Sequence, residues 1–242
     1  MPQLTIISFN AHAGLQPRRD GQCAPYDLVE VLRGFDDADV IVLQESFIPD
    51  DEPAAVQKVA AELGAQLHEL PLGRVKLDPW PQFSDTDPAA TGTTCIAILS
   101  RVPSTRVGKL PVGRVFADPA RERGALHVEL DVDGTAVDLI GVHLTSRLPH
   151  GPPIQMSRLL PQLPPAGRPA VVAGDHNFWG PGVVTFLRGW HRAVRGRTWP
   201  ASRPHSQIDH ILVRPDTHVV RGEVLPDVGS DHRPVRAVLR FG

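Results

Sequence analysis

Short apolar runs that each stop at a polar residue are the feature that most limits how this chain can fold. In the central run, 170–173, Gly174 then lets the backbone turn, and Asp175 and Asn177 follow. The other runs and the polar residues after them are 4–9 with Asn10, 40–43 with Glu45, 137–142 with His143, and 207–208 with Asp209. A further polar group, 230–232, precedes the last apolar segment. Because strand ends converge in sheet enzymes, this pattern predicts acids, amides and imidazoles around one pocket.

Length and composition predict one large globular domain. The 242 residues are 41% hydrophobic, which is enough to bury a substantial core, and we expect residues 1–242 to form a single domain rather than two small ones. The formal net charge of -2 gives no overall attraction to nucleic acid or to an anionic membrane, although arginines cluster in 101–123 and 188–203. Cys23 and Cys95 have no metal-ligand spacing, which argues against disulfide and structural-zinc scaffolds.

The N-terminal region predicts a cytoplasmic protein. A strand begins near Leu4, and we find neither a charged leader nor an apolar segment long enough to cross a bilayer. A secreted chain whose signal peptide had been removed would look the same. Nothing in the sequence requires an obligate protein partner, so we expect a monomer.

Hydrophobic periodicity predicts strands interspersed with short helices. Helices are expected over 26–32, 52–63, 154–163 and 183–187, and strands, besides the runs above, over 93–99, 207–213, 218–225 and 235–239. Asp133 and Gly134 join segments 125–132 and 135–142 in the strongest hairpin signal. Segment 71–91 is rich in Pro, Asp and Gly with little periodicity, and it is predicted to be a long loop.

The polar residues at the predicted strand ends form an oxygen-rich set without cysteine, which suits Mg²⁺ or Mn²⁺ better than zinc. Glu45 is the best candidate for a metal ligand, with support from Asn10 and Asp231. An aspartate beside a histidine fixes the tautomer of the imidazole and favours its protonated form, and Asp209 with His232 is a candidate pair of this kind. Such an imidazolium would stabilise charge that develops on a phosphoryl group.

Several of these residues also have a structural explanation when each is taken alone. Asn10 and Asp175 each have the alternative interpretation of an ordinary turn residue. A histidine such as His143 is more often a hydrogen-bonded, partly buried residue than a catalyst. His210 follows Asp209 on a predicted strand, so its side chain should point to the opposite face. The ordered set, not any single member, favours an enzyme.

Two arginines and two tryptophans have both a functional and a structural interpretation. Arg123 and Arg147 could clamp a phosphate, but surface salt bridges are the simpler expectation for each. Trp80 and Trp179 could stack on a base or line a lipid channel. For both tryptophans, anchoring of the core or of a loop is the simpler expectation.

Six motifs occur in the chain in a fixed order that extends from Ser8 to Val238. They are SFNAHAG around Asn10, VIVLQES around Glu45, IGVHLTS around His143, VVAGDHN around Asp175 and Asn177, QIDHILV around Asp209, and GSDHRPV at 229–235. In this order they resemble the endonuclease/exonuclease/phosphatase superfamily. That group includes deoxyribonuclease-like enzymes, abasic-site exonucleases, sphingomyelinases and inositol-polyphosphate phosphatases.

The resemblance implies an α/β (α+β) fold, namely a four-layer α/β/β/α sandwich in which two mixed β-sheets are flanked by helices. It also implies a divalent ion at one end of the sandwich. By this resemblance Glu45 looks like the principal metal ligand, and Asn10 and Asp231 support it. The ion would be Mg²⁺, with Mn²⁺ as an alternative.

The resemblance also suggests roles for the other motif residues. Asp175 looks like the residue that orients or deprotonates the attacking water, and Asn177 resembles the amide that holds the phosphate. His232, paired with Asp209, looks like the group that contacts the scissile phosphate. His143 resembles a second residue on the phosphate or leaving-group side.

Two histidines depart from the pattern of the superfamily. His12 stands where some nuclease members have an acid, which argues against a second metal contact there. His176 fills a usually apolar position and is left out of the catalytic set.

These observations predict a divalent-metal-dependent phosphoester hydrolase in which water attacks phosphorus directly. A nuclease-like phosphodiesterase is favoured, and its partner is then a phosphate-ester substrate, either nucleic acid or a small molecule. The alternative is a phosphomonoesterase that acts on a small phosphorylated sugar, lipid headgroup or nucleotide. A non-catalytic binding module is disfavoured because the acids, amides and histidines are all intact.

Overall fold

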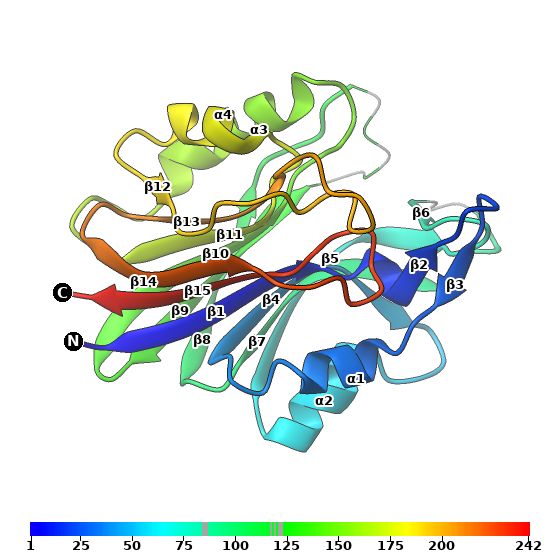
Figure 1. Cartoon of the computed structure of the whole chain (residues 1–242), viewed down its shortest axis with the longest axis horizontal. Helices are drawn as coiled ribbons and strands as arrows, with labels where there is room; N and C mark the ends of the chain where they lie inside the picture. The colour runs from blue at the N-terminus through cyan, green and yellow to red at the C-terminus, as the bar shows by residue number, and fades with distance from the viewer. Residues whose placement is uncertain (84–86, 117, 119, 121–122) are drawn as a thin grey trace.

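Two large sheets packed face to face form the centre of the computed structural model, which describes residues 1–83, 87–116, 118, 120 and 123–242. One sheet carries two helices on its outer face, α1 (Leu28–Arg33) and α2 (Ala55–Leu63). The other sheet carries α3 (Gly151–Leu159) and α4 (Gly180–Phe186). The two helix pairs therefore lie on opposite sides of the sheets (Figure 1), and the predicted four-layer sandwich is confirmed.

The first sheet has seven strands in the order β14-β15-β1-β4-β7-β5-β6. Their bounds are β1 (Gln3–Asn10), β4 (Val40–Pro49), β5 (Gln66–Lys76), β6 (Gln82–Phe83), β7 (Gly92–Ser100), β14 (Thr217–Val224) and β15 (Val235–Phe241). β1 and β4 are parallel, whereas β1 and β15 are antiparallel. This sheet is therefore mixed.

The second sheet has six strands in the order β12-β13-β11-β10-β9-β8. Their bounds are β8 (Ser104–Pro111), β9 (Gly124–Val132), β10 (Thr135–His143), β11 (Ala170–Asp175), β12 (His191–Arg192) and β13 (Asp209–Val213). β10 and β11 are parallel, and the other neighbours are antiparallel, so this sheet is also mixed. Outside both sheets lie a ribbon of β2 (Leu15–Pro17) and β3 (Cys23–Pro25) and two 3₁₀ turns, η1 (His12–Gly14) and η2 (Leu160–Gln162).

The central strands are apolar on both faces because both faces are buried. In β1, Leu4 and Ile6 pack between the sheets, whereas Ile7 and Phe9 pack against α1 and α2. β11 follows the same alternation, with Val171 and Ala173 between the sheets and Val172 against α3 and α4. Successive side chains of a strand point to opposite faces, so a strand covered on both sides becomes a continuous apolar run.

The runs 4–9, 40–43, 137–142 and 170–173 lie in β1, β4, β10 and β11. The run 207–208 is not a strand, and Asp209 begins β13 instead of following a strand. Because β13 is antiparallel to β11, its first residue still lies beside Asp175.

The prediction of a long loop over 71–91 is wrong for part of that segment. β5 extends to Lys76 and pairs with β7 along its length, and β6 adds a short strand at the edge. The pairing of β5 with β7 shifts register between Pro71 and Gly73. Pro71 has no backbone N–H to donate to the ladder, and it is accommodated at this irregularity. Residues 84–86 of the predicted loop, and 117, 119, 121 and 122 of the first arginine cluster, lie outside the described residues.

The helices of the described chain are all short. Asp27 caps α1 by accepting the backbone N–H of Glu30 at 2.9 Å, and Gly64 ends α2 in the left-handed region with φ 60°. In the part of the chain that the structure describes, no helix has the length and apolar character needed to span a membrane.

Candidate active site

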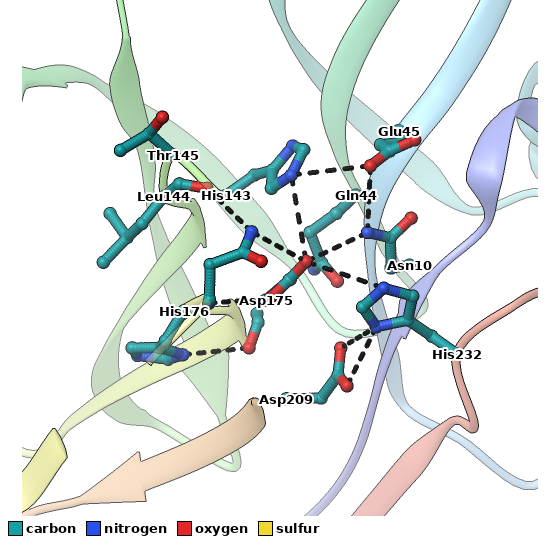
Figure 2. A network of polar contacts seen from close by, with 12 residues as sticks. Asn10, Gln44, Glu45, His143, Leu144, Thr145, Asp175, His176, Asp209 and His232 are labelled. Atoms are coloured by element: carbon teal, nitrogen blue, oxygen red, sulfur yellow. Dashed lines mark hydrogen bonds and ion pairs between the residues drawn. The ribbon is translucent and has the colours of Figure 1, made fainter. Parts of the chain in front are cut away.

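The polar residues predicted at the strand ends meet at one edge of the sandwich. β1 and β4 run parallel and bring Asn10 beside Gln44 and Glu45, while β10 and β11 run parallel and pair His143 with Asp175. Figure 2 shows these side chains converging from the two sheets, together with Asp209 and His232. The gathering of residues from position 10 to position 232 agrees with the spatial expectation from sequence.

Glu45 is aimed into this centre by an irregularity of β4. The pairing of β4 with β7 shifts register between Leu43 and Ser46, and Glu45 has a φ of 49°, in the left-handed region. A non-glycine residue in this region is strained, and such strain is concentrated at functional sites. The Glu45 side chain remains 24% exposed.

Asn10 joins the two carboxylates of the centre. Its Oδ1 accepts the backbone N–H of His12 at 3.0 Å, and since that group can only donate, the orientation of the amide is fixed. The Nδ2 of Asn10 therefore faces Glu45 Oε1 at 3.2 Å and Asp175 Oδ2 at 3.1 Å. The hydroxyl of Ser230 donates to the Asn10 carbonyl at 2.7 Å, which ties the loop before β15 to the end of β1.

Asp175, like Asp209, is an almost fully buried carboxyl of the centre. Its Oδ1 accepts the backbone N–H of Asn177 at 2.8 Å, and its Oδ2 accepts from Asn177 Nδ2 at 3.1 Å as well as from Asn10. Asn177 Nδ2 also donates to the Leu144 carbonyl at 3.0 Å, at the end of β10. Burial raises the pKa of Asp175 to about 7, with His232 opposing the increase and Asp209 adding to it. A carboxyl that titrates near neutrality can accept a proton from water.

His232 and Asp209 form a buried pair. The Nδ1 of His232 lies 3.0 Å from both carboxylate oxygens of Asp209, so Nδ1 carries a proton. Burial alone would lower the pKa of His232, but Asp209 and Asp175 outweigh it and raise the pKa well above its ordinary value. The resulting imidazolium directs Nε2 toward Asp175 Oδ2, 3.9 Å away, and Asp231 Oδ1, 4.0 Å away.

His143 lies between the two sheets and differs from His232 in its protonation state. Its Nε2 is 3.6 Å from Glu45 Oε1 and 3.8 Å from Asp175 Oδ2. Burial, reinforced by Arg123 and His232, holds the pKa of His143 well below its ordinary value, so the imidazole is neutral. The centre thus contains one charged and one neutral histidine.

Arg123 is buried rather than at the surface, and the expectation of a surface salt bridge was wrong. Only 3% of the residue is exposed, and its Nε donates to Asp118 Oδ2 at 2.8 Å. Its NH1 donates to the backbone carbonyl of His143 at 3.1 Å. The arginine therefore holds the end of β10 in place rather than facing the cavity as a free cation.

The oxygen atoms of the centre fit a hard divalent cation. Glu45 and Asp231 each retain part of their carboxylate surface, and the amide oxygen of Asn10 has a second lone pair. Asp231 Oδ2 accepts a hydrogen bond from Trp199 Nε1 at 3.4 Å, and Asp231 Oδ1 lies 3.9 Å from His12 Nδ1. His12 therefore lies beside an acid of the centre, and its Nδ1 also bonds the Leu15 carbonyl at 2.8 Å.

A second group of candidate ligands is buried deeper in the same centre. Asp175, Asp209 and His232 each place one ligand atom within 4.8 Å of the others. Because Asp209 and His232 already bond each other, the partly exposed carboxylates of Glu45 and Asp231 are the better candidates for metal ligands.

Two cavities open on this centre. The main cavity, about 540 Å³, is lined by His143, Asp175, Asn177, Asp231 and His232 together with Trp179 and Trp199. The side cavity, about 460 Å³, is lined by Trp80, Phe83, Thr94, Arg123 and Arg147. The cavities share four lining residues, namely Glu45, Pro81, His143 and Ser146. The polar centre is therefore reached from two sides.

The two tryptophans singled out in the sequence differ in their environment. Trp80 does anchor a loop, because its Nε1 donates to the Gly21 carbonyl at 2.8 Å, and it also lines the side cavity. Trp179 is 72% exposed at the main cavity, so the expectation that it anchors the core or a loop was wrong. Trp199 was not predicted, because its contact with Asp231 joins residues 32 positions apart and leaves no local signal.

His176 and His210 lie behind the centre and line neither cavity. Their rings meet edge to face with centroids 5.3 Å apart. A ring nitrogen of His176 bonds the Gly174 carbonyl at 2.9 Å, and one of His210 bonds the Phe178 carbonyl at 2.9 Å. His210 thus points away from the face of Asp209, as its neighbouring position on the strand predicts.

Comparison with known proteins identifies the family. A family model described as the Endonuclease/Exonuclease/phosphatase family matches residues 7–232. The chain belongs to this family. Enzymes of the endonuclease/exonuclease/phosphatase family hydrolyse phosphoesters and generally use divalent metals. None of the curated proteins that were searched matched the chain.

Solved structures share the fold of this family member at low sequence identity. An endonuclease/exonuclease/phosphatase from Beutenbergia cavernae is 22% identical with a TM-score of 0.74, and the match covers 100% of this chain and 72% of that one. A mannosyl-6-phosphatase from Bacteroides thetaiotaomicron is 19% identical with a TM-score of 0.67, over 98% and 100% of the chains. Sphingomyelinase C from Streptomyces griseocarneus is 20% identical with a TM-score of 0.65, over 98% and 99%.

Proposed function

We propose that this chain is a divalent-metal-dependent phosphoester hydrolase, and that it prefers diesters. The observation that carries the proposal is the set of contacts around Asp175. This buried carboxyl titrates near neutrality and lies 3.9 Å from the Nε2 of a protonated His232. A base and a cation held side by side at a cavity are suited to the attack of water on a phosphoryl group.

Asp175 is the candidate general base. Its carboxylate would accept a proton from the attacking water, and the two donors of Asn177 fix its orientation. His232 would donate from Nε2 to a phosphoryl oxygen as negative charge develops there, and Asp209 keeps the ring protonated and oriented. His143, neutral and beside Glu45, would serve as a second hydrogen-bonding group on the phosphate or leaving-group side.

Glu45, Asn10 and Asp231 are the residues proposed to hold the metal ion. A bound Mg²⁺ or Mn²⁺ supplies positive charge to the non-bridging phosphate oxygens. Mg²⁺ usually takes one or two protein carboxylates and fills its remaining positions with water and substrate oxygens, so this small set is sufficient. All three belong to the first sheet or its connections, since Asn10 ends β1, Glu45 lies in β4 and Asp231 lies between β14 and β15. Asp175 and Asp209 belong to the second sheet.

The diester preference is supported by the two cavities. A phosphomonoester carries one ester-linked organic group on its phosphate. A diester carries two, and they point in different directions from the phosphorus atom. Both cavities reach Glu45 and His143, so each could receive one substituent. We further propose that residues 1–242 act as one domain, because both sheets contribute to the centre.

Hydrolysis of two chromogenic esters tests this proposal. Bis-p-nitrophenyl phosphate and p-nitrophenyl phosphate are each incubated with the protein and Mg²⁺, Mn²⁺ or a chelator. We expect metal-dependent release of p-nitrophenolate, with a higher kcat/KM for the diester. A higher kcat/KM for the monoester would make the chain a phosphomonoesterase, and no turnover of either ester by a protein shown to bind Mg²⁺ would reject the enzyme.

Variants at the centre test the assigned roles. We expect Asp175→Asn and His232→Asn each to lower kcat by about a hundredfold or more, the usual effect of losing a general base or a charge-stabilising group. Asp20→Asn, at an exposed loop position, is the matched control and should leave kcat unchanged. Full activity in either variant of the centre would show that the role is wrongly assigned.

A further inference from the structure

The side cavity has the composition of a binding site for a flat, charged group. Trp80 and Phe83 supply aromatic surface, both are partly exposed, and Thr94, Ser146 and Arg147 supply polar groups. Its volume, about 460 Å³, falls within the range of small-molecule pockets. Flat rings stack on aromatic side chains, which makes such walls selective for an unsaturated ring.

The aromatic walls of the side cavity are held in place by neighbouring groups. Trp80 is fixed by its hydrogen bond to the Gly21 carbonyl and by an edge contact with the His12 ring, with centroids 5.9 Å apart. The guanidinium of Arg123 lies over the ring of Phe83, 5.4 Å from the ring centroid. Arg123 is fixed in turn by Asp118 and by the His143 carbonyl. A preformed wall reduces the entropy that a ligand loses on binding.

The two arginines of the side cavity differ in whether their charge is balanced. Arg123 forms a buried ion pair with Asp118 at 2.8 Å. Arg147 is exposed, and among the residues that the structure describes no carboxylate lies within 4.0 Å of its guanidinium. The Arg147 guanidinium is therefore available to pair with an anion in the cavity.

We propose that the side cavity is a second substrate subsite, which receives a phosphoester substituent that carries a flat unsaturated ring and an anionic group. Trp80 and Phe83 contact the ring, and Arg147 pairs with the anion. This inference rests on the proposed function, because the phosphate must lie at Glu45 and His143, where the two cavities meet. The substituent in the main cavity would instead contact Trp179 and its apolar neighbours.

Binding of three non-hydrolysable phosphonates tests the subsite without turnover. Methylphosphonate has no ring, phenylphosphonate adds the ring, and 4-phosphonobenzoate adds a carboxylate beyond the ring. Each is titrated calorimetrically into the full chain in the presence of Mg²⁺. We expect phenylphosphonate to bind about tenfold more tightly than methylphosphonate, the scale of one stacked ring, and the added carboxylate to increase affinity several-fold further.

Variants of the side cavity separate the contribution of the ring to the affinity from that of the carboxylate. Trp80→Ala should remove the advantage of the ring, whereas Trp80→Phe should retain most of it, so a loss caused by misfolding is recognised. Arg147→Ala should remove only the advantage of the carboxylate and should leave the affinity for methylphosphonate unchanged. Arg240→Ala is the control for net charge, because Arg240 pairs with Gln3 at the start of β1, the opposite end from Asn10.

The outcomes are distinguishable from those of the proposed function. Equal affinities for the three phosphonates, or no binding of any of them, would overturn the subsite even if bis-p-nitrophenyl phosphate is hydrolysed. A ring advantage that is lost in Trp179→Ala but kept in Trp80→Ala would place the ring in the main cavity and would also overturn it. Absence of metal-dependent hydrolysis, with the phosphonate pattern intact, would instead reject the proposed reaction.

Discussion

Glu45 occupies a backbone conformation that few residues other than glycine adopt. Its φ of 49° lies at the point where the pairing of β4 with β7 shifts register, and regular pairing resumes at Ser46. Such a conformation costs about 1–3 kcal/mol and persists only where the surrounding structure enforces it. Here the flanking ladder does so, and the effect is to turn a carboxylate from the sheet toward Asn10 and His143.

A Glu45→Gln variant should require a higher concentration of Mg²⁺ for its activity. The substitution keeps the size of the side chain but removes the charge that would bind a hard cation, so we expect the Mg²⁺ concentration for half-maximal activity to rise by about tenfold or more. Activity is measured over a Mg²⁺ titration. The matched control is Glu69→Gln, on β5, where the carboxylate accepts a hydrogen bond from the Gln57 side chain. This substitution should not change the Mg²⁺ requirement. An unaltered Mg²⁺ dependence in Glu45→Gln would remove Glu45 as a ligand.

His176 should make folding sensitive to acid. Burial, opposed by the Gly174 carbonyl and Asp209, lowers the pKa of His176 to about 4, so the folded state keeps the ring neutral while the unfolded chain protonates near pH 6.5. Its contribution is complete above about pH 6.5 and is lost as the pH falls toward 4, by about 2 kcal/mol at pH 5. The pKa of His210 is also held well below its ordinary value, by burial and by His176 and Arg192, so His210 contributes in the same direction.

Urea unfolding at pH 7 and pH 5 measures this effect. In His176→Leu the Gly174 carbonyl loses its donor at both pH values, so the variant is less stable overall. Its loss of unfolding free energy between the two pH values should nevertheless be smaller than that of the unsubstituted chain by about 2 kcal/mol. An identical pH dependence in the two proteins would contradict the prediction.

At the scale of elements, a buried network connects α3 to the end of β10. Gln155 on α3 accepts the backbone N–H of Thr145 at 2.7 Å and donates to the Gly113 carbonyl at 2.9 Å. Asp118 and Arg123 continue the network to the carbonyl of His143. The strand that carries His143 is therefore fixed beyond its last ladder bond by groups that lie far apart in the chain.

The Asp118 and Arg123 pair should show strong coupling in a double-mutant cycle. Asp118→Ala leaves the guanidinium buried without its partner, and we expect a loss of about 3–5 kcal/mol of unfolding free energy. Arg123→Met should also destabilise, but the double variant should lose less than the sum, because neither charge is then left unpaired. Chemical unfolding followed by circular dichroism measures all four proteins. Additive losses would mean that the ion pair does not couple the two residues.

The sequence predicted elements where burial produced a regular pattern and failed where it did not. β11 and β10 are buried on both faces and appear as apolar runs. β8 is an edge strand with mostly exposed side chains, so it has no apolar run to recognise, and β5 carries Pro71 and Gly73 at its irregularity. β8 is a strand because it pairs with β9, and β5 is a strand because it pairs with β7. Both pairings are tertiary effects that local sequence does not reveal.

At the scale of the whole molecule, the ordered motifs predicted which residues meet, but not how they bond. The sequence could pair Asp209 with His232 because both motifs end in the same pocket. It could not place Arg123 in the interior, since the partner that makes burial tolerable, Asp118, is known only from the fold. Nor could it anticipate the side cavity, whose walls come from β4, β5, β6, β7, the end of β10, the η1 turn and loop residues such as Trp80 and Arg123.

The candidate centre depends on the spacing of the two sheets, because Asn10 and Glu45 belong to one and Asp175 to the other. Gly141 on β10 lies at the contact between them. A Cβ on Gly141 would meet Ile96 Cγ2 at 3.1 Å and Val42 Cγ1 at 3.2 Å, both on the opposite sheet. Close-packed interiors do not absorb added atoms without displacement, so a larger residue here must move one sheet relative to the other.

Gly141→Val should therefore reduce stability and activity together. Overpacking of this kind costs about 1–3 kcal/mol of unfolding free energy, and a misplacement of reacting groups by about 1 Å can lower the rate by about a hundredfold. Thermal unfolding and the kcat for bis-p-nitrophenyl phosphate are measured on the same preparations. Gly108→Val, on β8 where a Cβ would meet no atom within 4 Å, is the matched control and should keep both properties. Full activity in a folded Gly141→Val protein would show that the two sheets can shift without disturbing the contact between Asn10 and Asp175.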